Sequence, residues 1–179
     1  MKHIKSILAV WGAISGIILI GASVYIAFEF TIGNADEYDT ASNNDVRFVL
    51  NWCELGDDRI ESVLHSYESS HSLTGDHLDA YAIKITHANI NELETPSQDY
   101  IKWTRGDKLQ GVLKQSVDLV SSFVGLDELA WFPSKGQLSS SEFYVNSWSI
   151  LLHGERPTAV KLIFVNPSNN IVYYASVKT

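Results

Sequence analysis

A long uncharged run between Lys5 and Glu29 dominates the N-terminal part of the sequence. It covers residues 6–28, is rich in Ile, Val, Ala and Gly, and has too few serines to make a polar stripe. A helix over this run is about 34 Å long, enough for a hydrocarbon core of about 30 Å. A single segment in lipid must satisfy its own backbone hydrogen bonds and is therefore helical. The run predicts one transmembrane helix over residues 6–28.

The residues that flank this run predict its orientation and leave one alternative open. Lys2 and Lys5 precede the run, whereas acidic residues follow it and no basic residue comes before Arg47. Because basic residues stay in the cytoplasm, we expect residues 1–5 to be cytoplasmic. The chain is then a single-pass cell-membrane protein with an extracytoplasmic C-terminal domain. The alternative is a cleavable signal peptide, for which residues 21–23 (Gly-Ala-Ser) supply a small-residue site.

Small residues within the run bear on partners. Gly12 and Gly16 match the spacing that lets two helices pack closely in lipid. The pattern also arises by chance in apolar segments, in which case these glycines face lipid. We expect the lipid bilayer to be the partner of residues 6–28, with self-association through Gly12 and Gly16, or binding to another protein, as a further possibility.

Composition excludes some classes of function for the rest of the chain. Asp and Glu outnumber Lys and Arg by 21 to 13, which gives a net charge of −8. An acidic protein is repelled by phosphate backbones, so we expect no nucleic-acid partner. Cys53 is the only cysteine, which excludes a disulfide within the chain and a cysteine-rich zinc site. We expect Cys53 to be a small buried residue in a strand.

The first half of the remaining chain predicts a linker, then a strand and a helix. Residues 29–45 are polar and acidic without an apolar period, which is typical of a linker before a globular domain over 46–179. Residues 46–53 alternate apolar and polar side chains and predict a strand. Residues 58–67 predict a helix, because their apolar side chains recur three and four residues apart behind a capping-box pattern at Asp58.

The second half predicts one long helix and several strands. Residues 80–86 alternate like a strand, and residues 107–124 carry an apolar helical stripe that ends before Gly125. Three β-like runs follow at 144–153, 158–165 and 171–177, joined by short turn-rich links. Short links require antiparallel pairs. We therefore expect an α+β fold, with a five-stranded, mainly antiparallel sheet packed on one face against two main helices.

Histidine and acid residues gather between positions 65 and 87, and they are the one suggestive chemical cluster. Imidazole and carboxylate groups bind zinc or move protons near neutral pH. The spacing does not place these residues on one helix face, so His71, His77 and Asp79 are weak metal candidates only. Three other groups invite a functional interpretation but have simpler explanations: the hairpin tip at His153, Glu155 and Arg156, the Arg105-Gly106-Asp107 triplet, and the apolar Trp131-Phe132-Pro133.

The chain shows no phosphate-binding loop, nucleophile elbow or zinc-binding helix motif. We therefore assign no catalytic residue and no cofactor, and we expect a non-catalytic interaction or structural role. The alternative is a membrane-bound hydrolase or metal-binding protein that uses the cluster at 65–87. A third possibility is a small-molecule binding domain, which would require a sizeable pocket between the sheet and the helices.

Overall fold

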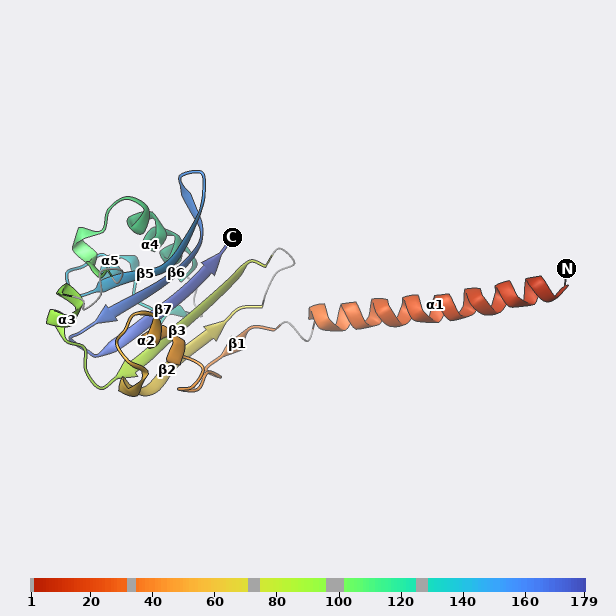
Figure 1. Ribbon diagram of the computed structural model, residues 1–179, viewed down its shortest axis with the longest axis horizontal. Coiled ribbons are helices and arrows are strands. Elements are labelled where there is room, and N and C mark those ends of the chain that lie inside the picture. Colours follow the sequence, from red (N-terminus) through yellow and green to blue (C-terminus); the bar gives the residue numbers. More distant parts are fainter. Residues whose placement is uncertain (1, 32–34, 71–74, 96–101, 125–128) are drawn as a thin grey trace. The chain divides into compact units, whose positions relative to one another are not determined.

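The computed structural model describes residues 2–31, 35–70, 75–95, 102–124 and 129–179, and within the first range it describes the side chains of residues 11–26. The chain divides into a helical unit, Met1–Ala35, and a compact unit, Asp36–Thr179 (Figure 1). Each unit is described by itself below.

The first unit is a single helix, α1 (Lys2–Thr31). Within the described residues, no helix is both long and apolar enough to cross a membrane. The predictions of a transmembrane helix over 6–28 and of a single-pass cell-membrane protein are therefore wrong.

The surface of α1 around its glycines is open. Apart from the chain neighbours and the backbone of the same helix, a Cβ atom added at Gly12 or Gly16 would meet no described atom within 4 Å. Large apolar side chains nearby are exposed, among them Trp11 at 66% and Ile17 at 71%. Self-association through Gly12 and Gly16 stays a prediction.

The compact unit is built on an antiparallel sheet, which has seven strands in the described residues. The prediction of five strands is wrong, because residues 46–53, predicted as a strand, form a helix, and three strands were not predicted, Glu37–Tyr38, Ile60–Glu68 and Thr104–Arg105. The strands lie in the order β1-β2-β3-β7-β6-β5-β4. Their bounds are β1 (Glu37–Tyr38), β2 (Ile60–Glu68), β3 (His77–Ile85), β4 (Thr104–Arg105), β5 (Tyr144–His153), β6 (Arg156–Asn166) and β7 (Ile171–Lys178).

Helices cover both faces of this sheet, and the expectation of helices on one face is wrong (Figure 1). On one face, α4 (Gly111–Phe123) and α5 (Lys135–Leu138) pack on side chains such as Leu78 and Leu162. On the other face, α2 (Arg47–Trp52) and α3 (Ile90–Glu94) pack on side chains such as Tyr81 and Ile163. Successive strand residues point to opposite faces, so the central strands supply both cores.

The first predicted strand is in fact a helix. The side chains buried around α2 are Val46, Val49, Leu50 and Cys53, which recur at three and four residues as one helix face requires. The alternation of residues 46–53 fits a strand equally well over so short a window, and the tertiary packing decides between the two. Cys53 is buried as expected, at 2% exposure, but it lies at the C-terminal cap of α2.

The first predicted helix, over residues 58–67, is in fact strand β2. Its register against β3 shifts twice, between Ile60 and Ser62 and between Val63 and His65. Each shift inserts an extra residue, so the apolar side chains lose strict alternation and imitate a helical spacing. Asp58 belongs to a short 3-10 helix, η1 (Asp57–Arg59), which precedes the strand.

The remaining elements follow the sequence more closely. Strand β3 and the antiparallel meander β5-β6-β7 confirm the strands predicted over 80–86 and over the last third of the chain. The long helix is confirmed but begins later than residue 107, because Gly106–Lys108 forms a separate 3-10 turn (η2). The β5–β6 hairpin turns at Gly154, whose φ of +64° suits glycine.

Candidate small-molecule site

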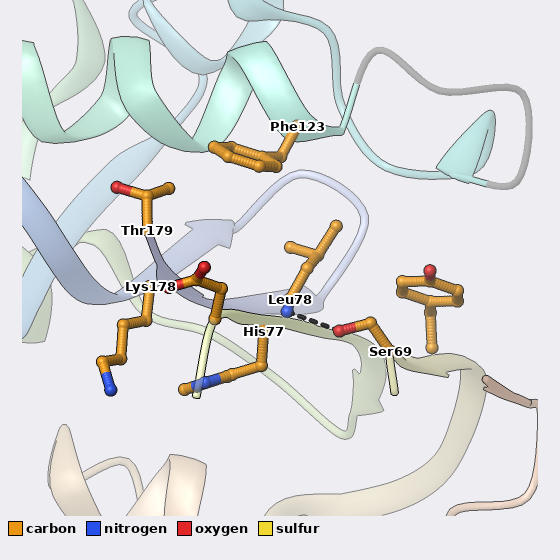
Figure 2. A pocket seen from close by; sticks show the side chains of 8 residues that line it. Ser69, His77, Leu78, Phe123, Lys178 and Thr179 are labelled. Atoms are coloured by element: carbon orange, nitrogen blue, oxygen red, sulfur yellow. Dashed lines mark hydrogen bonds between the residues drawn. The ribbon is translucent and has the colours of Figure 1, made fainter. Parts of the chain in front are cut away.

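A pocket of about 410 Å³ lies where β3 begins, β7 ends and α4 ends. Figure 2 shows Phe123 reaching from α4 toward Leu78 of β3, with Thr179 beside them, while His77 and Lys178 point away from the helix. The lining residues come from β2, β3, α4 and β7 and their adjoining turns: Tyr67, Ser69, Asp76, His77, Leu78, Phe123, Lys178 and Thr179. Residues distant in sequence thus meet at one end of the sheet.

Backbone pairing fixes the floor of this pocket. His77 pairs with Lys178 across β3 and β7, and Leu78 pairs with Val177. The Leu78 N–H donates to Ser69 Oγ at 2.7 Å, and the Ser69 N–H donates to the Leu78 carbonyl at 2.9 Å (Figure 2). Because Ser69 satisfies both backbone groups of Leu78, the Leu78 side chain is held in place under Phe123.

Tyr67 forms an apolar part of the wall and is anchored at its hydroxyl. The hydroxyl donates to Asp36 Oδ2 at 3.0 Å, and the Ser70 N–H donates to Asp36 Oδ1 at 2.7 Å. The hydrogen bond from the Ser70 backbone lowers the pKa of Asp36; burial opposes the shift, and the Tyr67 hydroxyl adds to it. The Tyr67 ring therefore stands in a fixed position between the pocket and residues 36–38.

His77 and Asp79, two of the predicted candidates, lie together on the face of β3 that also carries Tyr81. His77 Nδ1 lies 3.0 Å from the Gly75 carbonyl, and a carbonyl only accepts, so Nδ1 carries hydrogen. His77 Nε2 lies 3.1 Å from Ser176 Oγ and 3.9 Å from Asp79 Oδ2. The pairing of Asp79 with Ser176 across β3 and β7 explains this proximity.

This histidine and serine do not have the arrangement of a hydrolase triad. In such a triad the carboxylate orients the histidine nitrogen that faces away from the serine. Here Asp79 and Ser176 both approach Nε2, and a backbone carbonyl takes the other nitrogen. Ser176 is also buried, at 2% exposure. The arrangement orients the imidazole but does not set up acyl transfer.

Two buried tyrosines lie in the next row of the same face, where Tyr81 pairs with Tyr174. Burial raises the pKa of Tyr81, and the hydrogen bond from its hydroxyl to Glu68 Oε1, at 2.8 Å, raises it further. Burial also raises the pKa of Tyr174. Both phenols stay protonated near neutral pH and do not serve as bases there.

Two other histidines of the cluster at 65–87, His65 and His87, do not line the pocket. His71 lies outside the described residues. His65 stacks on Trp131 at 5.2 Å between ring centroids, and His87 contacts the adjacent Thr86. Among the residues that the structure describes, no three His, Cys, Asp or Glu side chains come together in a way that could hold a metal ion.

The three other sequence groups have structural explanations. The hairpin-tip residues His153, Glu155 and Arg156 are exposed. Arg105 donates to Asp107 through two nitrogens at 2.7 and 3.0 Å, which ties the triplet to itself. The apolar Trp131-Phe132-Pro133 segment folds onto the core, where Phe132 is 5% exposed.

Sequence reasoning missed most of the pocket. Tyr67, Phe123 and Lys178 carried no local chemical signal, because each is a common residue in its element. Phe123 did belong to the predicted apolar stripe of the long helix, but its place at the open end of the sheet depends on the packing of α4. Comparison with protein-family models, with curated proteins and with solved structures finds no match to this chain.

Proposed function

We propose that residues 36–179 form a non-catalytic binding module that takes up a small, mainly apolar molecule in the pocket at the end of α4. The observation that carries this proposal is the pocket itself, about 410 Å³ in volume and walled by Tyr67, Leu78 and Phe123. Ligand sites in proteins typically measure about 300–1,000 Å³ and combine an apolar lining with a few polar groups.

The wall of the pocket is suited to binding because it is already ordered. The Tyr67 hydroxyl is held by Asp36 and the Leu78 N–H by Ser69 Oγ, so both wall residues are fixed by hydrogen bonds within the protein. A ligand therefore orders few protein groups when it binds, which reduces the entropic cost of association. Apolar surface removed from water contributes about 25 cal/mol per Å² to binding.

Polar groups at the rim supply orientation. Asp76, His77 and Lys178 line the same pocket and carry charged or ionisable groups. Such groups fix which end of a ligand points outward, while the apolar wall supplies most of the affinity. The expected ligand is thus a compact apolar or aromatic molecule with one polar end.

Titration of the 36–179 fragment with anilinonaphthalene sulfonate tests this function, because the dye is compact and aromatic and fluoresces in apolar surroundings. We expect saturable binding that Phe123→Ala weakens about tenfold, since the variant removes one wall of the pocket. Val112→Ala is the matched control, because Val112 is an exposed residue of the same helix and does not line the pocket.

Equal dye binding by the fragment and by Phe123→Ala would reject the pocket as the site. Circular dichroism of each protein separates a local loss of binding from unfolding. Dye bound by unfolded chain would show no saturation and no difference between the two alanine variants.

A further inference from the structure

Strand β5 forms an open edge of the sheet over much of its length. Strand β4 is short and pairs only with Tyr144 and Val145 of β5, and the Asn146 side chain donates to the Lys102 carbonyl. Over the described residues, the outer side of β5 has no partner strand from residue 147 to residue 153. Figure 1 shows the β5–β6 hairpin projecting past the end of β7. This edge does not line the pocket at the end of α4, so its role is independent of the function proposed above.

The opposite edge of the sheet, along β2, is protected. Strand β1 pairs with the end of β2. Asn43 accepts from the Val63 N–H and donates to the Glu61 carbonyl, both at 3.2 Å, and the Ser66 N–H donates to Asp39 Oδ1 at 3.0 Å. Unpaired edges invite pairing with another chain, and proteins commonly block them. Strand β5 is therefore the edge that stays available.

The hydrogen bonds of β5 indicate which backbone groups face outward. The Leu151 carbonyl accepts from Thr158 Oγ1 at 3.5 Å, so the backbone groups of Leu151 point toward β6. Successive residues of an antiparallel strand point their N–H and C=O groups to opposite sides. Ile150 and Leu152 therefore present their N–H and C=O groups to the open edge. Among the described residues, these groups have no hydrogen-bond partner on that side.

Strand β5 is regular between residues 149 and 153. One register shift against β6 places an extra residue at Trp148 of β5, and the other places its extra residue at Thr158 of β6. The hairpin turn at Gly154 follows the strand. The regular stretch has the length of an ordinary short strand, which is enough to pair with another strand.

The side chains along this edge are apolar and uncharged. Leu151 and Leu152 are 61% and 48% exposed although they point to opposite faces of the sheet, and Trp148 is 47% exposed. No residue from 143 to 152 carries a charge, whereas the whole chain has a net charge of −8. Two copies of this edge therefore approach each other without the repulsion that acts between the rest of their surfaces. Exposed apolar patches of this kind mark interaction sites.

We propose that β5 pairs antiparallel with β5 of a second copy of the chain, around a two-fold axis at Leu151. This register uses both outward-facing residues, because Ile150 of each copy lies opposite Leu152 of the other and each such pair exchanges its N–H···O=C bonds. Leu151 lies opposite Leu151 of the other copy, on the other face of the sheet. The pairing thus satisfies the open backbone groups and covers the exposed leucines of both chains.

Cysteine crosslinking of the full chain tests this register. Residues opposite each other in a non-hydrogen-bonded antiparallel pair have Cα atoms about 4.5 Å apart, a distance that a disulfide spans. We expect Leu151→Cys to form a covalent dimer under mild oxidation with diamide. Leu64→Cys is the matched control, because Leu64 is a 41% exposed leucine of β2 at the protected edge. It should crosslink no more than the unchanged chain, whose Cys53 is only 2% exposed.

Charges at the two-fold axis test the same pairing without a covalent bond. Like charges directly opposite each other on neighbouring strands destabilise the pair. We therefore expect Leu151→Lys to raise the dissociation constant of the dimer about tenfold or more in analytical ultracentrifugation of the full chain. Leu64→Lys should leave the constant unchanged. An equimolar mixture of Leu151→Lys and Leu151→Glu should associate again, which a misfolded variant could not do.

Three results would overturn the proposal. A full chain that stays monomeric shows that a second copy does not occupy the edge. Equal crosslinking of Leu151→Cys and Leu64→Cys places the contact elsewhere, since association through other surfaces, such as α1, affects both variants alike. If the mixture of Leu151→Lys and Leu151→Glu associates no better than Leu151→Lys alone, the two positions do not lie opposite each other and the two-fold register is wrong.

Discussion

At the scale of single residues, the environment of Cys53 determines its reactivity. Burial raises the pKa of the Cys53 thiol to about 12, and the thiol donates to the Leu50 carbonyl at 3.5 Å. Because only the thiolate reacts, we expect iodoacetamide at about pH 8 to label the folded chain on the order of a thousandfold more slowly than the urea-unfolded chain. Mass spectrometry measures both rates; similar rates would mean that Cys53 is accessible.

The residues of the candidate site show how far single positions could be predicted. His77 and Asp79 were candidates because their side chains can bind metals and transfer protons. The contact of His77 with Ser176 was not predictable, because it joins positions 99 residues apart through the register of β3 against β7. The sequence therefore identified His77 from its chemistry. It did not identify Ser176, because no local pattern encodes the pairing of β3 with β7.

At the scale of elements, an ion pair joins η1, which directly precedes β2, to helix α3. Arg59 donates to both oxygens of Glu92, at 2.6 and 3.1 Å. Burial alone would raise the pKa of Glu92, but the hydrogen bonds from Arg59 and the Asn89 backbone outweigh it and lower the pKa below its ordinary value of 4.5. The pair therefore stabilises the fold above about pH 4.5, and this contribution is lost as the pH falls through the lowered pKa.

Glu92→Gln tests this pair, because glutamine can still cap α3 as Glu92 does but has no charge. We expect the variant to lower the free energy of unfolding by about 1 kcal/mol near pH 7, since the pair is partly exposed. At about pH 3 the difference from the unchanged chain should shrink. Urea unfolding at the two pH values measures it, and a difference that does not depend on pH would rule out the charge as the cause.

Elements were predictable from the sequence where periodicity had only one interpretation. The meander β5-β6-β7 combines apolar alternation with turn-rich links, and both signals agree. Residues 46–53 were expected to form a strand but form a helix, because apolar alternation over so few residues also fits a short helix. Residues 58–67 were expected to form a helix but belong mainly to β2, because its bulges space the apolar side chains as in a helix. In both segments, burial against the sheet decides between helix and strand. Which side chains are buried depends on the whole fold and not on the local sequence.

At the scale of the whole molecule, residues 36–45 belong to the compact unit because they bond to β2. Asp36 accepts from Tyr67 and Ser70, and Asp39 Oδ1 accepts from the Ser66 N–H at 3.0 Å. The Asp39 N–H donates to the Ser66 carbonyl at 2.9 Å, which continues the pairing of β1 with β2. Strand β1 therefore covers the β2 edge of the sheet, which would otherwise expose unpaired backbone groups.

Truncation tests the contribution of this segment. We expect the 36–179 fragment to fold, and the 46–179 fragment to fold with a free energy of unfolding lower by about 2–4 kcal/mol, because several hydrogen bonds, two of them to the Asp36 carboxylate, are lost. Urea unfolding of the two fragments measures the difference. Asp36→Asn in the longer fragment separates the charge from the strand pairing and should produce only part of the loss. Equal unfolding midpoints for 36–179 and 46–179 would show that β1 does not stabilise the fold. Residues 36–45 would then pair with β2 without adding stability. The hydrogen bond from Tyr67 to Asp36 would not be required to hold the Tyr67 ring in the pocket wall.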